Sequence, residues 1–70
     1  MVEPLAEDSA IVFTFIKSYS GITGNSLILE TGFDHDRVID AVKALVLRGM
    51  VHVDLTNYPN FRKCRLYPKV

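Results

Sequence analysis

Three basic side chains lie close together in the segment "FRKCRLY", where they could bind a polyanion such as a nucleic acid. They are Arg62, Lys63 and Arg65, and the last two are separated by a single residue. If this segment is a strand, residues two apart point to the same face and could hold adjacent phosphates. The alternative is a solvated strand edge, where charged side chains prevent unwanted pairing with another strand. Of the two, we favour phosphate contact.

A second group of candidates lies in the stretch "DHDRVIDAVKALVLRG", residues 34–49. Arg37 could donate two hydrogen bonds to a guanine or to a phosphate, and Lys43 could contact DNA from the same helix. Asp40 lies three positions from each, so either could instead form an intrahelical ion pair contributing about a few tenths of a kcal/mol. Both interpretations stay open. A carboxylate that faces DNA repels phosphates, so Asp36 and Asp40 count against nonspecific binding by this helix.

The charges of the chain are distributed unevenly although the formal net charge is zero. Residues 1–36 carry one base against six acids, a net charge of −5, whereas residues 37–70 carry seven bases against two acids, a net charge of +5. Such asymmetry indicates a charged partner for the basic half. Alternatively, the two halves attract each other within one fold.

Residues typical of catalysis or metal binding are sparse in this chain. It contains one cysteine, Cys64, and two histidines, His35 and His52, which are too few and too isolated for a metal site. It shows neither a Ser/His/Asp set nor a G-x-x-x-x-G-K phosphate loop. We therefore expect no catalytic residues, no metal and no cofactor, and a protein that is not an enzyme.

The composition indicates one small globular domain outside the membrane. At 70 residues, 49% hydrophobic and 23% charged, the chain resembles ordinary globular proteins rather than disordered ones. No apolar run approaches the roughly 18 residues that a membrane helix needs. The lone cysteine and the acidic start "MVEPLAEDS", which lacks the pattern of a signal peptide, favour a cytoplasmic location.

The candidate side chains must be positioned by elements whose start and stop signals appear in the sequence. The expected helix caps are Asp8 or Ser9, then Asn25 or Ser26, then Asp34. After Gly49 the apolar period changes to two, which indicates a strand, a turn at Pro59 and a returning strand. The predicted elements are helices over about 9–19, 25–31 and 34–48 and a β-hairpin over about 51–67.

Two helices carry one apolar face each, which predicts the core. In the third helix this face consists of Val38, Ala41, Val42 and Leu45, and in the first of Ile11, Val12, Phe15, Ile16 and Tyr19. Phe13 and Leu47 fall outside these faces, so either could contact a second copy or a protein partner. Cys64 alternates with charged neighbours, and we expect it to be a small buried hydrophobic residue.

At "ILETGFDHDRVIDAVKALVLRGMVHV" the chain resembles the winged helix-turn-helix superfamily of small DNA-binding domains. The matching features are Gly32 and Phe33 in the turn, Asp34 as the cap of the next helix, and Gly49 before the wing. The resemblance covers residues 9–67 and does not select a subfamily.

This resemblance implies one domain over residues 1–70 with an α+β fold, a three-helix winged helix-turn-helix with a C-terminal β-hairpin wing. In that superfamily the third helix enters the major groove and the wing touches the DNA backbone. We therefore expect double-stranded DNA as the partner and a role in transcription regulation. The residues expected at the DNA are Arg37, Lys43 and Ala44 near base edges and Arg62, Lys63 and Arg65 on phosphates.

One alternative retains this fold but replaces DNA with a protein partner. Asp36, Asp40 and Leu47 on the third helix, together with the zero net charge, favour an adaptor or anti-regulator without DNA binding. A homodimer or a protein partner held through Phe13 or Leu47 is part of this expectation.

Overall fold

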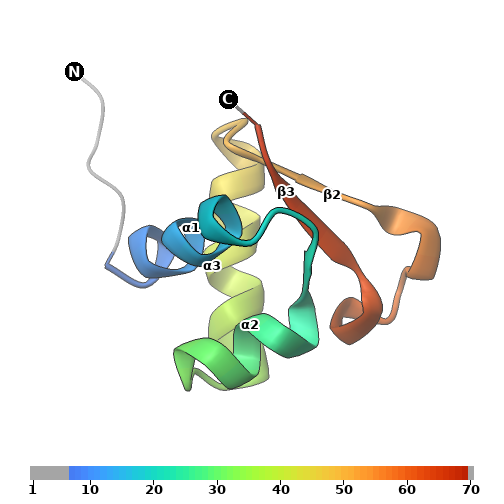
Figure 1. The fold of residues 1–70 in the computed structure, drawn as a ribbon, viewed down its shortest axis with the longest axis horizontal. Helices are drawn as coiled ribbons and strands as arrows, with labels where there is room; N and C mark the ends of the chain where they lie inside the picture. The colour runs from blue at the N-terminus through green and yellow to red at the C-terminus, as the bar shows by residue number, and fades with distance from the viewer. Residues whose placement is uncertain (1–6, 70) are drawn as a thin grey trace.

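The structure is a computed structural model that describes residues 7–69, in which three helices combine with three short strands (Figure 1). In chain order the elements are α1 (Glu7–Ser18), β1 (Ile22–Thr23), α2 (Gly24–Thr31), α3 (His35–Leu47), β2 (Val51–Val53) and β3 (Arg65–Pro68). The predicted fold class, α+β with three helices followed by a C-terminal wing, is confirmed.

The three strands form an antiparallel sheet in which the last strand is the middle one. β3 pairs with both β1 and β2, so the strand order is β1-β3-β2. Leu66 of β3 lies opposite Ile22 on one side and opposite Val53 on the other. The sequence did not reveal β1, because a strand of two residues is too short to show an alternating pattern.

The helix boundaries agree with the predictions to within two residues, but two predicted caps are wrong. α1 begins at Glu7, so Asp8 and Ser9, the two predicted caps of this helix, lie inside it. Asp34 caps α3 as expected, since its carboxylate accepts a hydrogen bond from the Arg37 amide at 2.8 Å. α2, however, is capped by Thr23 and not by Asn25 or Ser26. The Thr23 hydroxyl accepts from the Ser26 amide at 3.2 Å, because the helix begins at Gly24 and leaves Thr23 in extended backbone.

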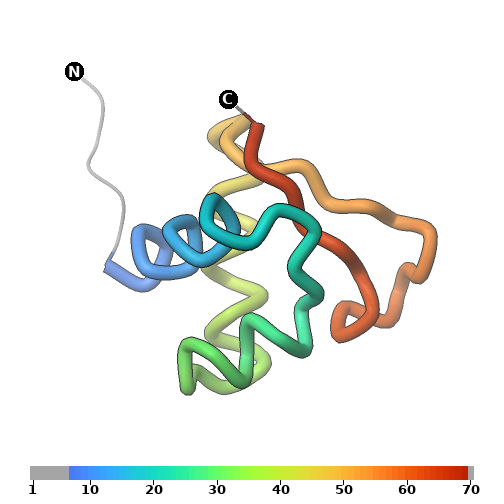
Figure 2. Tube along the Cα trace, viewed as in Figure 1, coloured from blue at the N-terminus to red at the C-terminus, as the bar shows by residue number. Residues whose placement is uncertain are grey.

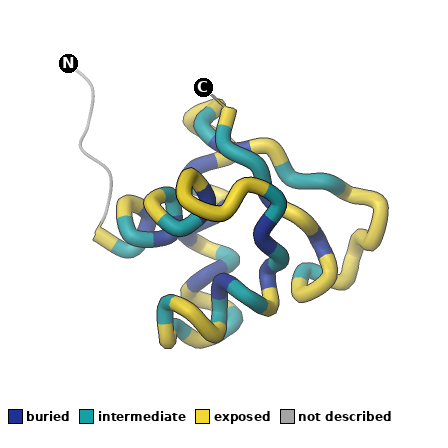
Figure 3. Tube along the Cα trace, in the orientation of Figure 1, coloured by how far each residue is buried: buried dark blue, intermediate teal, exposed yellow. Residues whose placement is uncertain are grey.

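The core lies between the helices α1, α2 and α3 and the sheet (Figure 3). The predicted buried positions of α3 are confirmed. Tyr19 was predicted to be buried but is 59% exposed, because α1 ends at Ser18. Phe13 was expected on an outer face, yet it is half-buried against the core, with the Lys17 ammonium 5.3 Å from its ring centroid. The buried hydrophobic residues of the core are Val12, Ile16, Ile22, Leu27, Val38, Ala41, Val42, Leu45, Val51 and Leu66.

The connection between β2 and β3, residues 54–64, is here called the wing loop. It contains two 3-10 turns, η1 (Leu55–Asn57) and η2 (Phe61–Lys63), so the predicted strand over "FRK" is wrong. Figure 2 shows the loop curling back toward the start of α2, and η2 packs against that helix. The wing therefore does not project freely but is seated on the body of the domain.

Glycine is required where the wing loop meets α2. A β-carbon built at Gly24 would lie 2.3 Å from the Phe61 carbonyl oxygen and 2.7 Å from its ring. Cys64 ends the same segment, 3% exposed, and its thiol donates a hydrogen bond to the Asn60 carbonyl at 3.4 Å. The prediction of a small buried residue at position 64 is confirmed.

Candidate nucleic-acid interface

Arg62, Lys63 and Arg65 converge on one shallow hollow between the wing loop and the start of α2. The hollow has a volume of about 550 Å³ and is here called the basic hollow. Its lining residues are Thr23, Asn25, Asn57, Asn60, Arg62, Lys63 and Arg65. Among residues 7–69, no carboxylate lines it, so its charge is uniformly positive.

Two of these cations are held in place by hydrogen bonds to distant parts of the chain. The Arg62 guanidinium donates to the Asn25 side-chain oxygen at 3.0 Å, and the Arg65 guanidinium donates to the Gly21 carbonyl at 3.1 Å. Each bond uses one of the five N–H donors of the guanidinium and leaves the others for a ligand. Holding the arginines in this way reduces the entropy lost when an anion binds.

Lys63 differs from the two arginines in having a free ammonium group. Across the described part of the chain this ammonium group has no ion-pair or hydrogen-bond partner, and the side chain is exposed. Lys63 closes η2 and Arg65 opens β3, so the prediction that they share one face of a strand is wrong. The chain instead brings them together by turning at Cys64.

The start of α2 adds backbone polarity to the same hollow. A helix N-terminus carries a partial positive charge from its unpaired amides. Thr23 caps this end and lines the hollow, and the Gly24 amide donates to the Cys64 carbonyl at 3.0 Å. The two anchored guanidinium groups and the ammonium group, beside this helix end, together form a surface suited to phosphate oxygens.

Arg37 lies outside the basic hollow and forms an ion pair with Asp8 of α1. Its guanidinium donates to both carboxylate oxygens of Asp8, at 2.7 and 2.9 Å, and lies 4.0 Å above the Phe33 ring centroid. The hydrogen bond from Arg37 holds the pKa of Asp8 below its ordinary value, and the same bond raises the pKa of Arg37. The ion pair between Arg37 and Asp40, one of the two interpretations left open by the sequence, does not form, and Arg37 makes this longer-range pair instead.

The remaining two predicted residues are also separated from the basic hollow. Lys43 is exposed on α3 and lines a second concavity, between α3 and the wing loop. Ala44, predicted to point outward, is half-buried. The outward side of α3 carries two exposed carboxylates, Asp36 and Asp40, and the exposed Leu47. The structure thus unites three of the six predicted residues and disperses the others.

The two residues of the basic hollow that precede the wing loop were missed because they lie far away in the sequence. Asn25 is 37 positions from its hydrogen-bond partner Arg62, and Thr23 belongs to the strand that the sequence did not reveal. The only local signal is the cap pattern "TGNS", which marks a helix start and says nothing about the wing loop.

His35 lies in the first turn of α3, beside the wing loop. Its ring is half-buried and meets the Phe61 ring edge-on, with centroids 5.8 Å apart. This contact joins the first turn of α3 to the wing loop.

Two further findings concern metals and membranes. In residues 7–69, no group of three or more histidine, cysteine or carboxylate side chains is placed to hold a metal ion. No helix of that part of the chain is both long enough and apolar enough to cross a bilayer.

No protein-family model, no curated protein and no solved structure matches this chain.

Proposed function

We propose that this protein binds double-stranded DNA and acts in transcription regulation as a member of the winged helix-turn-helix superfamily. The observation that carries this proposal is the basic hollow, where Arg62, Lys63 and Arg65 meet at the start of α2. Phosphates bind arginine, lysine and helix N-termini, and most contacts between proteins and DNA go to the backbone. The order of helices, strands and wing supports the same proposal.

The proposal assigns the backbone contacts to the basic hollow and does not rely on α3 to read bases. Asp36 and Asp40 on the outward side of α3 would face phosphates, and Arg37 is already bound to Asp8. Lys43 is then the one predicted base-reading cation of α3 without a partner in the described chain. Binding of this kind is dominated by charge and shape rather than by base edges.

We also propose that the protein is cytoplasmic and that two copies of it act together on DNA. Cys64 is a free, buried thiol, which suits a reducing compartment. A single small module buries only about 600–1,000 Å² on DNA, so two modules acting together would bind more firmly. Leu47 is 87% exposed and suits a protein contact, whereas Phe13 is packed against the core.

Binding of a labelled short duplex, followed by fluorescence anisotropy as salt is raised, tests the function. If three cations each neutralise one phosphate, the logarithm of the binding constant falls with a slope of about −2.7 against the logarithm of salt concentration. Affinity then drops by about 40-fold between about 50 and 200 mM salt. Replacing Lys63 and Arg65 together by alanine lowers the slope to about −0.9 and the drop to about fourfold.

The matched control is Lys17→Ala, which removes an exposed cation from α1, outside the basic hollow. It leaves both the affinity and the salt slope close to those of the unchanged protein. Circular dichroism confirms that each variant remains folded. If the double variant binds as well as Lys17→Ala, the basic hollow is not the surface that contacts DNA. If the unchanged protein does not bind the duplex at low salt, the protein does not bind DNA.

A further inference from the structure

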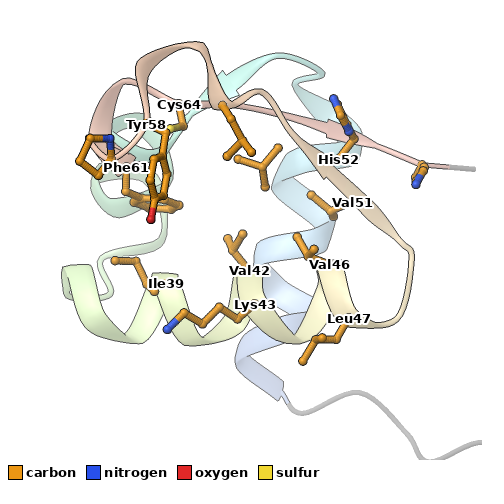
Figure 4. A pocket seen from close by; sticks show the side chains of 14 residues that line it. Ile39, Val42, Lys43, Val46, Leu47, Val51, His52, Tyr58, Phe61 and Cys64 are labelled. Carbon is orange, nitrogen blue, oxygen red and sulfur yellow. The ribbon is translucent and has the colours of Figure 1, made fainter.

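An apolar groove lies between α3 on one side and β2 with the wing loop on the other (Figure 4). Its volume is about 810 Å³, and it is here called the α3 groove. Val42 and Val46 reach into it from α3, while Tyr58 and Phe61 close the end formed by the wing loop. None of the residues lining the basic hollow also lines this groove, so the two are separate surfaces.

Exposed hydrophobic side chains are concentrated at the α3 groove. Four of the six large exposed hydrophobic residues within residues 7–69 line it, namely Val46, Leu47, Leu55 and Tyr58. Single exposed hydrophobic residues are common, but a contiguous group of them marks a surface that another molecule covers. These four are exposed although they line the groove, so a small ligand within it would leave much of their surface in water. A protein partner covers them more completely.

The charged side chains that line the α3 groove have one sign. Its basic lining residues within the described chain are Lys43 of α3, His52 of β2 and Lys69, which follows β3. Lys43 therefore stands on the α3 side of the groove and Lys69 on the side of the sheet. No carboxylate of residues 7–69 lines the groove, since Asp36 and Asp40 are exposed on α3 outside its lining. The groove is complementary to a partner with negative charge on both sides of an apolar face.

The geometry of the α3 groove favours a helix over an extended strand as its occupant. β2 is an edge strand, but Val51 in it is only 2% exposed, so the main chain there is covered and cannot pair with an added strand. A helix satisfies its own backbone hydrogen bonds and presents side chains alone. The lining residues of α3 run from Ile39 to Leu47, a distance of about 12 Å, which matches about two turns of a facing helix.

We propose that the α3 groove binds an acidic amphipathic helix of another protein. Apolar side chains at positions i, i+3 or i+4, and i+7 of that helix enter the groove between Val46 of α3 and Tyr58 of the wing loop, and they cover Leu47. Carboxylates on the two flanks of its apolar face lie against Lys43 on one side and Lys69 on the other.

This proposal goes beyond DNA binding and does not depend on it. An occupied α3 groove leaves the basic hollow open, because the two surfaces share no lining residue. Where both proposals hold, the protein links the acidic partner to DNA. Failure of one proposal leaves the other standing.

Two labelled synthetic peptides of opposite charge test the proposal by fluorescence anisotropy with the full chain. Each has about 15 residues, the length at which an isolated helix is marginally stable. The acidic peptide carries leucines at i, i+3, i+4 and i+7, glutamates on both flanks of that face and alanines elsewhere, and the basic peptide has lysine in place of every glutamate. The acidic peptide binds about tenfold more tightly at low salt or better, because two lysine–glutamate pairs at a partly exposed rim together contribute about that factor.

Two pairs of substitutions locate the bound peptide. Leu47→Ala weakens the acidic peptide by about tenfold or more, because a leucine that is 87% exposed in the free protein is no longer there to be buried. Leu29→Ala is its matched control, since Leu29 is 73% exposed on α2 outside the groove, and it leaves the affinity unchanged. Lys43→Glu reduces the preference for the acidic peptide, whereas Lys17→Glu makes the same change of charge on α1 and preserves the preference.

A further variant separates the α3 groove from the basic hollow, which would also attract an acidic peptide. Replacing Lys63 and Arg65 together by alanine leaves the affinity for the acidic peptide close to that of the unchanged protein. The proposal is overturned if the acidic peptide does not bind, or if it binds no better than the basic one. It is also overturned if Leu47→Ala has no more effect than Leu29→Ala, or if the binding is lost with Lys63 and Arg65. Tighter binding of dodecanoate, a small apolar acid, than of the acidic peptide would likewise replace the helix by a small ligand.

Discussion

Replacing Gly24 by alanine tests whether the wing loop is seated on the start of α2. The added β-carbon would lie 2.3 Å from the Phe61 carbonyl oxygen, and 2.7 and 2.8 Å from two carbons of its ring. The ring could rotate away, but the carbonyl belongs to the backbone. The Gly24 amide also donates to the Cys64 carbonyl at 3.0 Å, which ties the same loop to position 24. The methyl group therefore cannot fit unless the loop moves.

Two opposing contributions set the size of the effect. Alanine is the better helix former, which alone would add about 0.5–1 kcal/mol to the free energy of unfolding. Forcing an extra methyl into a filled site costs about 1–3 kcal/mol, and a clash with a backbone oxygen lies toward the upper end of that range. We expect a net loss of about 1–2 kcal/mol, which in a domain of this size lowers the melting temperature by about 5–15 °C.

Thermal unfolding followed by far-ultraviolet circular dichroism measures this loss, because the chain has no tryptophan for fluorescence. Amide hydrogen exchange shows which part of the chain is destabilised. The Lys63 and Cys64 amides donate within the wing loop, to Asn60 and Phe61, and should exchange faster once the loop is displaced.

Gly32→Ala is the control, since a β-carbon there meets nothing within 4 Å. Gly32 has a φ of 73°, so alanine at this position introduces backbone strain, but it leaves exchange in the wing loop unchanged. A Gly24→Ala protein that melts no lower than the unchanged chain, with its wing-loop amides equally protected, would show that the loop is not seated on α2.

Two other substitutions address α3. Asp34→Ala removes the cap that accepts from the Arg37 amide and should lower the free energy of unfolding in urea by about 1 kcal/mol, whereas an unchanged value would contradict the capping role. Arg37→Ala should raise the pKa of Asp8 back toward 3.8, as measured by carboxyl carbon NMR. The folded-state pKa of Asp8 lies below its ordinary value of 3.8. The stabilisation from the Asp8–Arg37 pair is therefore fully present above pH 3.8 and is lost as the pH falls through the folded-state pKa. An Asp8 pKa that does not respond to the substitution would mean that the pair is absent in solution.

The features of α3 could be predicted from sequence because they are encoded locally. Asp34 is three residues from the amide that it caps, and the buried positions recur at the helical period within one helix. Local signals of this kind identified all three helices and the paired strands on either side of the wing loop. They also located Cys64 correctly, since its burial follows from the alternation in its own segment.

The candidate site could not be predicted in full because its contacts join distant parts of the chain. Arg37 binds a carboxylate 29 positions away, although an aspartate three positions away matches the usual helical spacing. Alternation in "FRKCRLY" indicated a strand, but packing of Phe61 on Gly24 holds the first three residues in a 3-10 turn instead. Tertiary packing thus overrode the local preference where the wing loop meets α2.

The place of β3 in the sheet determines the order in which parts of the fold can form during synthesis. Because β3 follows β1 and β2 in the chain and yet lies between them, a ribosome completes both outer strands before the strand that joins them. The helices can form as they emerge, but Leu66, which is fully buried, reaches the core only afterwards. A message cut short before the codon for Arg65 therefore gives helices with an uncovered core, and not a smaller working domain.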